Sequence, residues 1–108
     1  LIKNALILGV AYKKNVDDDR ESPAWKVIKN LQKLNYEVSV YDNYVSTFDK
    51  KNIKKRIKKL DYKKNYFDCS VILTDHSKVD YKKILQISQK IFDTRYVYKF
   101  KDIKIERI

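Results

Sequence analysis

Three short segments carry residue types suited to binding anions or moving protons, and each follows an apolar run. Tyr12-Lys13 follows the first run, Thr74-Asp75-His76 the third, and Asp93-Thr94-Arg95 the fourth. Lysine supplies a flexible point charge, and arginine supplies a planar fork that suits phosphate. If the runs are parallel strands, all three segments lie at the sheet edge where open α/β sheets bind ligands. Lys13 and Arg95 are therefore candidates for binding an anion, with solvent-exposed loop charges as the equal alternative.

Other reactive side chains are better explained as structural. His76 is the single histidine, and since no titratable partner stands out, a hydrogen-bonded loop histidine is favoured over a general acid or base. Cys69 comes at the start of a buried run and is expected to be a core residue. The aspartates at 17–19 suggest a metal cluster, but consecutive carboxylates rarely converge on one ion. We expect them to bond loop amides near a helix start, and no metal site is predicted.

The elements that must position these segments alternate between strands and helices. Asn4–Leu8 predicts a buried strand ending at Gly9, and Ser22-Pro23 predicts a helix start with Ser22 as the N-cap. The apolar residues of that helix recur at helical spacing and predict one buried stripe: Ala24, Val27, Ile28, Leu31 and Leu34. The order strand, helix, strand favours a parallel pair with a right-handed crossover.

The second half of the chain repeats this alternation. Further strands are predicted at Glu37–Tyr41, in CSVILTD and in KIFDTR up to Asp93, with an edge strand in the C-terminal tail. Asp80 predicts the cap of a helix that carries Ile84. The fold class is α/β, a three-layer, mostly parallel sheet. It is Rossmann-like without the glycine-rich fingerprint, because Gly9 is the only glycine and G-x-G-x-x-G needs three.

Charge and composition limit the function classes. The net charge is +11, from 25 Lys and Arg against 14 Asp and Glu, which permits binding to polyanions. Seven basic residues lie between Lys50 and Lys59, near Tyr62 and Tyr66. A solvated basic surface, as an amphipathic element or a strand, is the favoured interpretation. Binding of RNA or another polyanion through this run is the alternative, although no nucleic-acid-binding motif accompanies it.

The 108 residues are expected to form a single domain of a longer polypeptide, because the chain contains no methionine even at position 1. The sequence has no apolar run of membrane-spanning length and no signal-peptide pattern, so no membrane partner is predicted. A single cysteine cannot form an internal disulfide, which favours a reducing cytoplasm.

A family resemblance then narrows the function. The segments GVAYKKNVDDDRESPAWKVIKNL and YEVSVYDNYV resemble the start of the C-terminal, UDP-binding domain of the UDP-glucose/GDP-mannose dehydrogenase family. The family pattern G-[LVF]-[AS]-[FY]-K-x-x-x-x-D-x-R-x-S-[PS]-[AS] is matched at Gly9, Tyr12, Lys13, Asp18, Arg20, Ser22, Pro23 and Ala24. VILTDHSKVDY resembles the T-x-H-x-x-[FY] segment of the family, and IFDTRYV its D-[TG]-R segment. The branch that acts on UDP-N-acetyl-hexosamines is the most similar.

The resemblance implies an NAD-dependent UDP-sugar 6-dehydrogenase that oxidises the C6 alcohol to a carboxylate for surface polysaccharide precursors. Residues 1–108 would be its UDP-sugar-binding domain, inactive alone and without a catalytic residue, so Cys69 is not the catalytic cysteine. NAD would bind mainly to an N-terminal domain, a central region would carry the catalytic cysteine, and the full-length protein would be a homodimer.

Residue by residue, the resemblance assigns Tyr12, Lys13 and Arg95 to the UDP-sugar and Arg20 to NAD. Two positions depart from the pattern: Asn43 replaces the proline of YDP, and Trp25 stands where an aliphatic residue is usual. The alternatives are a stand-alone basic module that binds RNA or another polyanion, and a structural lobe with little ligand affinity.

Overall fold

The computed structural model describes residues 3–11, 15, 23–42, 55–57 and 59–107, with only the backbone at 55–56. The described residues form six strands and two helices: β1 (Lys3–Leu8), α1 (Ala24–Lys33), β2 (Tyr36–Tyr41), β3 (Lys55–Ile57), β4 (Cys69–Ile72), α2 (Tyr81–Gln86), β5 (Ile91–Asp93) and β6 (Ile105–Arg107). They include the predicted strands and both predicted helices.

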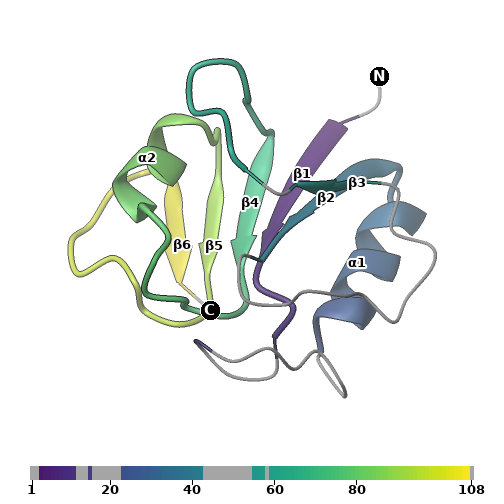
Figure 1. The fold of residues 1–108 in the computed structure, drawn as a ribbon, viewed down its shortest axis with the longest axis horizontal. Helices are drawn as coiled ribbons and strands as arrows, with labels where there is room; N and C mark the ends of the chain where they lie inside the picture. Colours follow the sequence, from purple (N-terminus) through teal and green to yellow (C-terminus); the bar gives the residue numbers. More distant parts are fainter. Residues whose placement is uncertain (1–2, 12–14, 16–22, 43–54, 58, 108) are drawn as a thin grey trace.

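The strands of this part of the chain form one sheet in the order β3-β2-β1-β4-β5-β6, with every neighbouring pair parallel (Figure 1). Strands β2 and β3 therefore lie on one side of β1, and the chain then returns to place β4, β5 and β6 on the other side. In doubly wound sheets, ligands bind at the carboxyl ends of the two strands where the strand order reverses. This topological switch point lies at the lower edge of the sheet in Figure 1.

Helix α1 covers one face of the sheet. Pro23 precedes it with helical backbone angles, and its carbonyl accepts a hydrogen bond from the N–H of Val27. Ala24 and Ile28 are buried against β1 and β2, as the apolar stripe predicts. The prediction for Leu34 is wrong, because the helix ends at Lys33 and the Leu34 side chain is 70% exposed.

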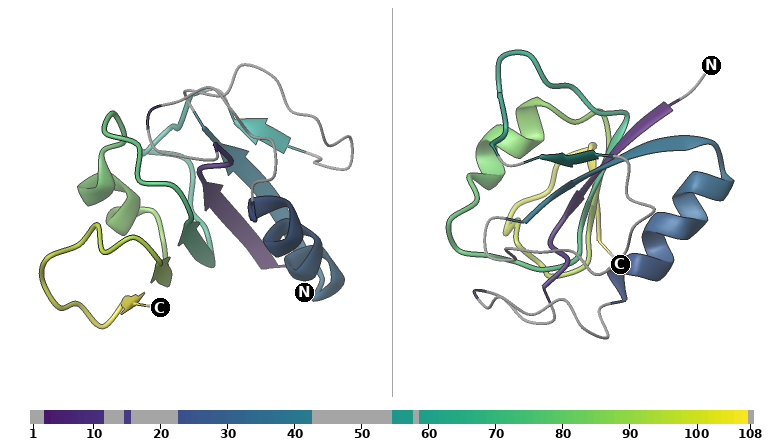
Figure 2. Two further views of the ribbon diagram at one scale, coloured as in Figure 1. Left: turned by 90° about the horizontal axis from the view of Figure 1, so that it is seen from below. Right: turned by 45° about the vertical axis from the view of Figure 1, so that its right-hand side comes forward.

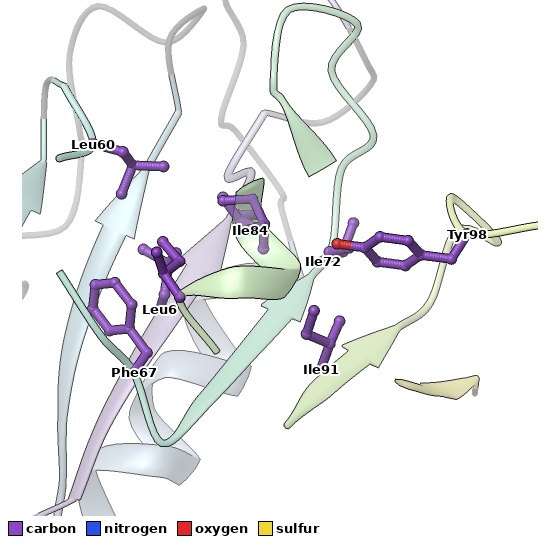
Figure 3. Close-up of a cluster of buried hydrophobic side chains, with 9 residues drawn as sticks. Leu6, Leu60, Phe67, Ile72, Ile84, Ile91 and Tyr98 are labelled. Carbon is purple, nitrogen blue, oxygen red and sulfur yellow. The ribbon is translucent and has the colours of Figure 1, made fainter. Parts of the chain in front are cut away.

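Helix α2 covers the other face, so the structure has the predicted three layers (Figure 2). Asp80 caps α2, as predicted, by accepting a hydrogen bond from the N–H of Lys83. Ile84 is fully buried in a cluster with Leu6 of β1, Ile72 of β4 and other apolar side chains (Figure 3). Burial on both faces explains why the central strands are nearly continuous apolar runs.

The basic run is only partly described. Lys55–Ile57 form β3, an edge strand beside β2, which agrees with a strand as the form of this segment. The basic residues at 50, 51, 54 and 58 lie outside the described residues. Within the described part of the chain, neither helix is long and apolar enough to cross a membrane.

Candidate functional site at the β1–β4 switch point

Gly9 brings the ends of β1 and β4 into direct contact. It has a φ of +94°, and a side-chain carbon added to it would lie 2.4 Å from Cβ of Thr74 and 2.7 Å from its backbone nitrogen. The Thr74 hydroxyl then donates a 2.9 Å hydrogen bond to the carbonyl of Ala11. Glycine is therefore required here both for its backbone conformation and for the space that Thr74 occupies.

Asp42 fixes the residues that follow Gly9. It comes directly after β2, is buried, and accepts hydrogen bonds through Oδ2 from the N–H groups of Val10 at 2.9 Å and Ala11 at 2.8 Å. A buried carboxylate needs several such donors to offset the loss of hydration. The backbone of Ala11 is thus held on both sides, by Asp42 at its N–H and by Thr74 at its carbonyl.

His76 holds the next described position of the same loop. Its side chain is buried, and Nδ1 accepts a 2.7 Å hydrogen bond from the N–H of Asn15. Nε2 lies 2.9 Å from Oδ1 of Asp42, close in distance but not aligned as a linear hydrogen bond. The Asn15 side chain makes two hydrogen bonds with Ser77, each of 2.9 Å. Its Oδ1 accepts from the Ser77 N–H, and its Nδ2 donates to the Ser77 hydroxyl. The prediction of a hydrogen-bonded loop histidine is confirmed.

Asp93 organises the loop that carries Arg95. It is buried at the end of β5 and accepts hydrogen bonds from the N–H groups of Arg95, Val97 and Tyr98, each at 3.0–3.1 Å. The exposed Arg95 side chain donates through Nε to the carbonyl of Leu73 at 2.8 Å. A guanidinium has five N–H donors, so this bond orients the group while its terminal nitrogens still carry donors.

The segment 73–77 therefore connects the two halves of the site. It contacts Ala11 and Asn15 through Thr74, His76 and Ser77, and it contacts Arg95 through Leu73. Residues more than 80 positions apart are brought to one edge of the sheet by these bonds. The site is a hydrogen-bonded frame with Arg95 on one side and Ala11 and Asn15 on the other.

Two tyrosines close the frame from the α2 side. The Tyr81 hydroxyl donates to the carbonyl of His76 at 2.9 Å, and the Tyr98 hydroxyl donates to the carbonyl of Tyr81 at 2.6 Å. Burial, and then the charges of Asp75, Asp93 and Asp42, raise the pKa of Tyr81 well above its ordinary value. Burial and Asp93 raise the pKa of Tyr98 in the same direction. Both phenols therefore act as neutral hydrogen-bond donors at physiological pH.

Of the four predicted site residues, the structure describes Arg95. Arg95 is at the carboxyl edge, as its place after the fourth predicted strand requires. Tyr12, Lys13, Arg20 and the aspartates at 17–19 lie outside the described residues, as does Asn43. Ala11 and Asn15, which flank the Tyr12-Lys13 segment, are both at the switch point.

Other possible sites have less support. Among the described residues, no group of three His, Cys, Asp or Glu side chains is placed to hold a metal ion. Tyr62, a suggested stacking group for RNA, is half-buried against the core with the ammonium of Lys83 over its ring at 5.3 Å. A surface hollow of about 400 Å³ lies beside β6 and is lined by residues of the segment 100–107.

The sequence interpretation missed two residues of the frame. The sequence patterns assign no role to Asp42, which lies in the YDN segment, or to Asn15. Asp42 is a carboxylate directly after a strand, which is a signal for the carboxyl edge. Asn15 has a φ of +61°, a conformation that asparagine tolerates well, but nothing in a single sequence indicates that the turn occurs there.

The strand order, the helix on each face and the hydrogen-bonded loops at the switch point define a doubly wound α/β domain of the nucleotide-binding type. The chain belongs to the UDP-glucose/GDP-mannose dehydrogenase family, whose UDP binding domain model matches residues 6–101. The predicted resemblance is thereby confirmed.

Several known proteins similar to this chain are UDP-N-acetyl-D-mannosamine dehydrogenases. UDP-N-acetyl-D-mannosamine dehydrogenase of Methanococcus vannielii is 39% identical over 88 residues, covering 79% of this chain and 19% of the relative. The enzyme of the same name from Methanocaldococcus jannaschii is 38% identical over 93 residues, covering 83% and 21%. The solved structure of UDP-D-ManNAc dehydrogenase from Pyrococcus horikoshii is 28% identical, with a TM-score of 0.70 over 98% of this chain and 25% of that one. The chain thus spans about a fifth of the length of the curated relatives.

Proposed function

We propose that this chain binds the uridine diphosphate part of a UDP-sugar at the carboxyl edge of β1, β4 and β5. The proposal extends to the whole protein as an NAD-dependent UDP-sugar 6-dehydrogenase, which oxidises the C6 alcohol to a carboxylate for surface polysaccharide precursors. The curated relatives named UDP-N-acetyl-D-mannosamine dehydrogenase support a UDP-N-acetyl-hexosamine as the substrate. We expect a cytoplasmic homodimer in which this domain contributes binding and no catalytic residue.

The observation that carries the proposal is the frame around segment 73–77. It fixes Arg95 at Leu73 and fixes Ala11 and Asn15, on either side of Tyr12-Lys13, at the same strand ends. A diphosphate carries charge that an arginine fork and a lysine ammonium offset well. In the proposed complex, Arg95 donates to phosphate oxygens, Lys13 adds charge, and Tyr12 contacts the nucleotide-sugar.

The described residues do not fit the pyrophosphate of NAD. A dinucleotide loop uses glycines so that the backbone can approach the pyrophosphate. Gly9 is the only glycine, and the space beside its Cα is filled by Thr74. NAD would supply hydride acceptance in the whole enzyme, bound mainly by other domains. The assignment of Arg20 to NAD is part of the proposal and rests on the family pattern alone.

Calorimetric titration of UDP tests the proposal. Arg95→Ala should weaken UDP binding about tenfold or more, since hydrogen bonds to charged groups contribute about 1.5–3 kcal/mol. Lys90→Ala is the matched control, because Lys90 directly precedes β5 and so lies at the opposite, amino edge of the sheet. Equal loss in both variants would indicate a nonspecific charge effect. Absence of UDP binding to the native protein would refute the proposed site.

A further inference from the structure

Asp42 and His76 form a buried connection between the two described positions that flank Tyr12-Lys13. Asp42 bonds the N–H of Ala11, and His76 bonds the N–H of Asn15. The two side chains approach each other to 2.9 Å and come from the ends of different strands, β2 and β4. Both of these hydrogen bonds are donated by backbone N–H groups, those of Ala11 and Asn15.

The hydrogen bonds specify the tautomer of His76. Nδ1 accepts from the Asn15 N–H and therefore carries no proton. In the neutral ring the proton is then on Nε2, the nitrogen that faces the Asp42 carboxylate. The carboxylate favours this tautomer, because the alternative would place a nitrogen lone pair against Oδ1. The opposite tautomer would direct two N–H groups at each other between His76 and Asn15.

We propose that Asp42 and His76 are positioning residues for UDP binding: Asp42 sets the tautomer of His76 so that His76 holds Asn15, and together they fix Ala11 and Asn15, the described residues of the loop after β1. This inference rests on the proposed function, in which that loop binds the nucleotide. Ala11 and Asn15 are anchored by Thr74 and Ser77 as well, so the loop ends are held by a connected set of bonds. Neither Asp42 nor His76 contacts the ligand in this proposal.

A pair of substitutions at one position separates positioning from general structural support. In His76→Asn the amide oxygen can take the place of Nδ1 and accept the Asn15 N–H, but the contact with Asp42 is lost. In His76→Gln the terminal amide can face Asp42, but no acceptor remains for Asn15. We expect His76→Gln to raise the Kd for UDP about fivefold, the range of one net hydrogen bond, and His76→Asn to change it less than about twofold.

Asp42→Asn tests the tautomer directly. If the side-chain amide NH2 group faces His76, it favours a lone pair on Nε2 and thus a proton on Nδ1, which conflicts with the Asn15 N–H. We expect this nearly isosteric change to weaken UDP binding about fivefold, and to shift the imidazole ¹⁵N resonances from the Nε2–H to the Nδ1–H pattern. Ser70→Ala is the control, because it removes a buried hydroxyl bonded to Ser88 at 2.6 Å and should leave UDP affinity unchanged.

The measurements use the full-length native protein, with calorimetry of UDP and ¹⁵N spectra of its ligand-free form. Equal UDP affinity in His76→Gln and His76→Asn, while the wild type binds UDP, would overturn the positioning role and leave the proposed function standing. An Nδ1–H tautomer in the wild type would overturn it without any ligand. Failure of the wild type to bind UDP would instead refute the proposed function. If Asp42→Asn does not fold, the His76 pair and the wild-type tautomer still decide the question.

Discussion

Replacing Gly9 with alanine should strongly destabilise the domain, because both the backbone conformation and the space beside Gly9 exclude a side chain. The backbone at Gly9 has a φ of +94°, which costs an L-residue about 1–2 kcal/mol. The added carbon would also lie 2.4 Å from Cβ and 2.8 Å from Oγ1 of Thr74, and overpacking of this kind costs about 1–3 kcal/mol. We expect Gly9→Ala to lower the free energy of unfolding by about 2–5 kcal/mol.

Urea denaturation followed by the fluorescence of Trp25 measures this change. Trp25 is the single tryptophan, and it packs half-buried against the cluster that contains Val10 and Ala11. The midpoint should fall by about 1–2.5 M for a slope of about 2 kcal/mol per M. Since the contact at 2.7 Å is to the backbone nitrogen of Thr74, shortening the Thr74 side chain should relieve only part of the cost.

A matched pair of Thr74 variants tests the steric explanation. Thr74→Gly removes both clashing side-chain atoms, whereas Thr74→Ala removes Oγ1 and keeps Cβ at the closest contact. The cost of Gly9→Ala should be smaller by about 1 kcal/mol or more in the Thr74→Gly background, and should fall less in the Thr74→Ala background, where the closest contact remains. A cost below about 1 kcal/mol in the wild type, or the same cost in all three backgrounds, would refute the reasoning.

Three other predictions concern buried groups. Asp93→Asn should lower the free energy of unfolding by about 2–3 kcal/mol in a denaturation experiment, because one amide oxygen cannot replace a carboxylate that accepts three N–H groups; a loss below about 0.5 kcal/mol would contradict this. Burial, and secondarily Asp68, raise the pKa of the Cys69 thiol, so native alkylation by iodoacetamide should be much slower than in urea, and equal rates would be inconsistent with a buried strand residue. The pKa values of Tyr81 and Tyr98 are raised in the folded state, so their protonated phenols contribute fully to the free energy of unfolding below about pH 10. This contribution is lost as pH rises further. Stability should therefore fall above pH 10, less steeply in Tyr98→Phe, and an unchanged slope in that variant would count against the assignment.

The fold was largely predictable because its determinants are local and periodic. The run Asn4–Leu8, the helical stripe from Ala24 and the Asp80 cap each predict one element, and a parallel strand pair follows from their order. Leu34 shows where periodicity fails, since the pattern continues one position beyond the end of the helix. The strand order on both sides of β1 was not predicted, because it depends on contacts between distant segments.

The site was predictable in location but not in its connections. Arg95 could be placed at a strand end because it follows the apolar run that forms β5. The roles of Asp42 and Asn15 depend on backbone N–H groups, which carry no sequence signal of their own. His76 could be predicted to be hydrogen-bonded, but Asn15, which bonds its Nδ1, lies 61 residues away in the chain, and Asp42, whose carboxylate faces its Nε2, lies 34 residues away.

Titration of UDP into the ¹⁵N-labelled protein is the most direct test of the central claim, that UDP binds at the carboxyl edge of β1, β4 and β5. The account predicts saturable shifts concentrated at the amides of Ala11, Asn15, Thr74 and Arg95, with little change at Lys90 at the opposite edge. Shifts confined to the basic segment around β3, or no shifts at saturating UDP, would contradict it.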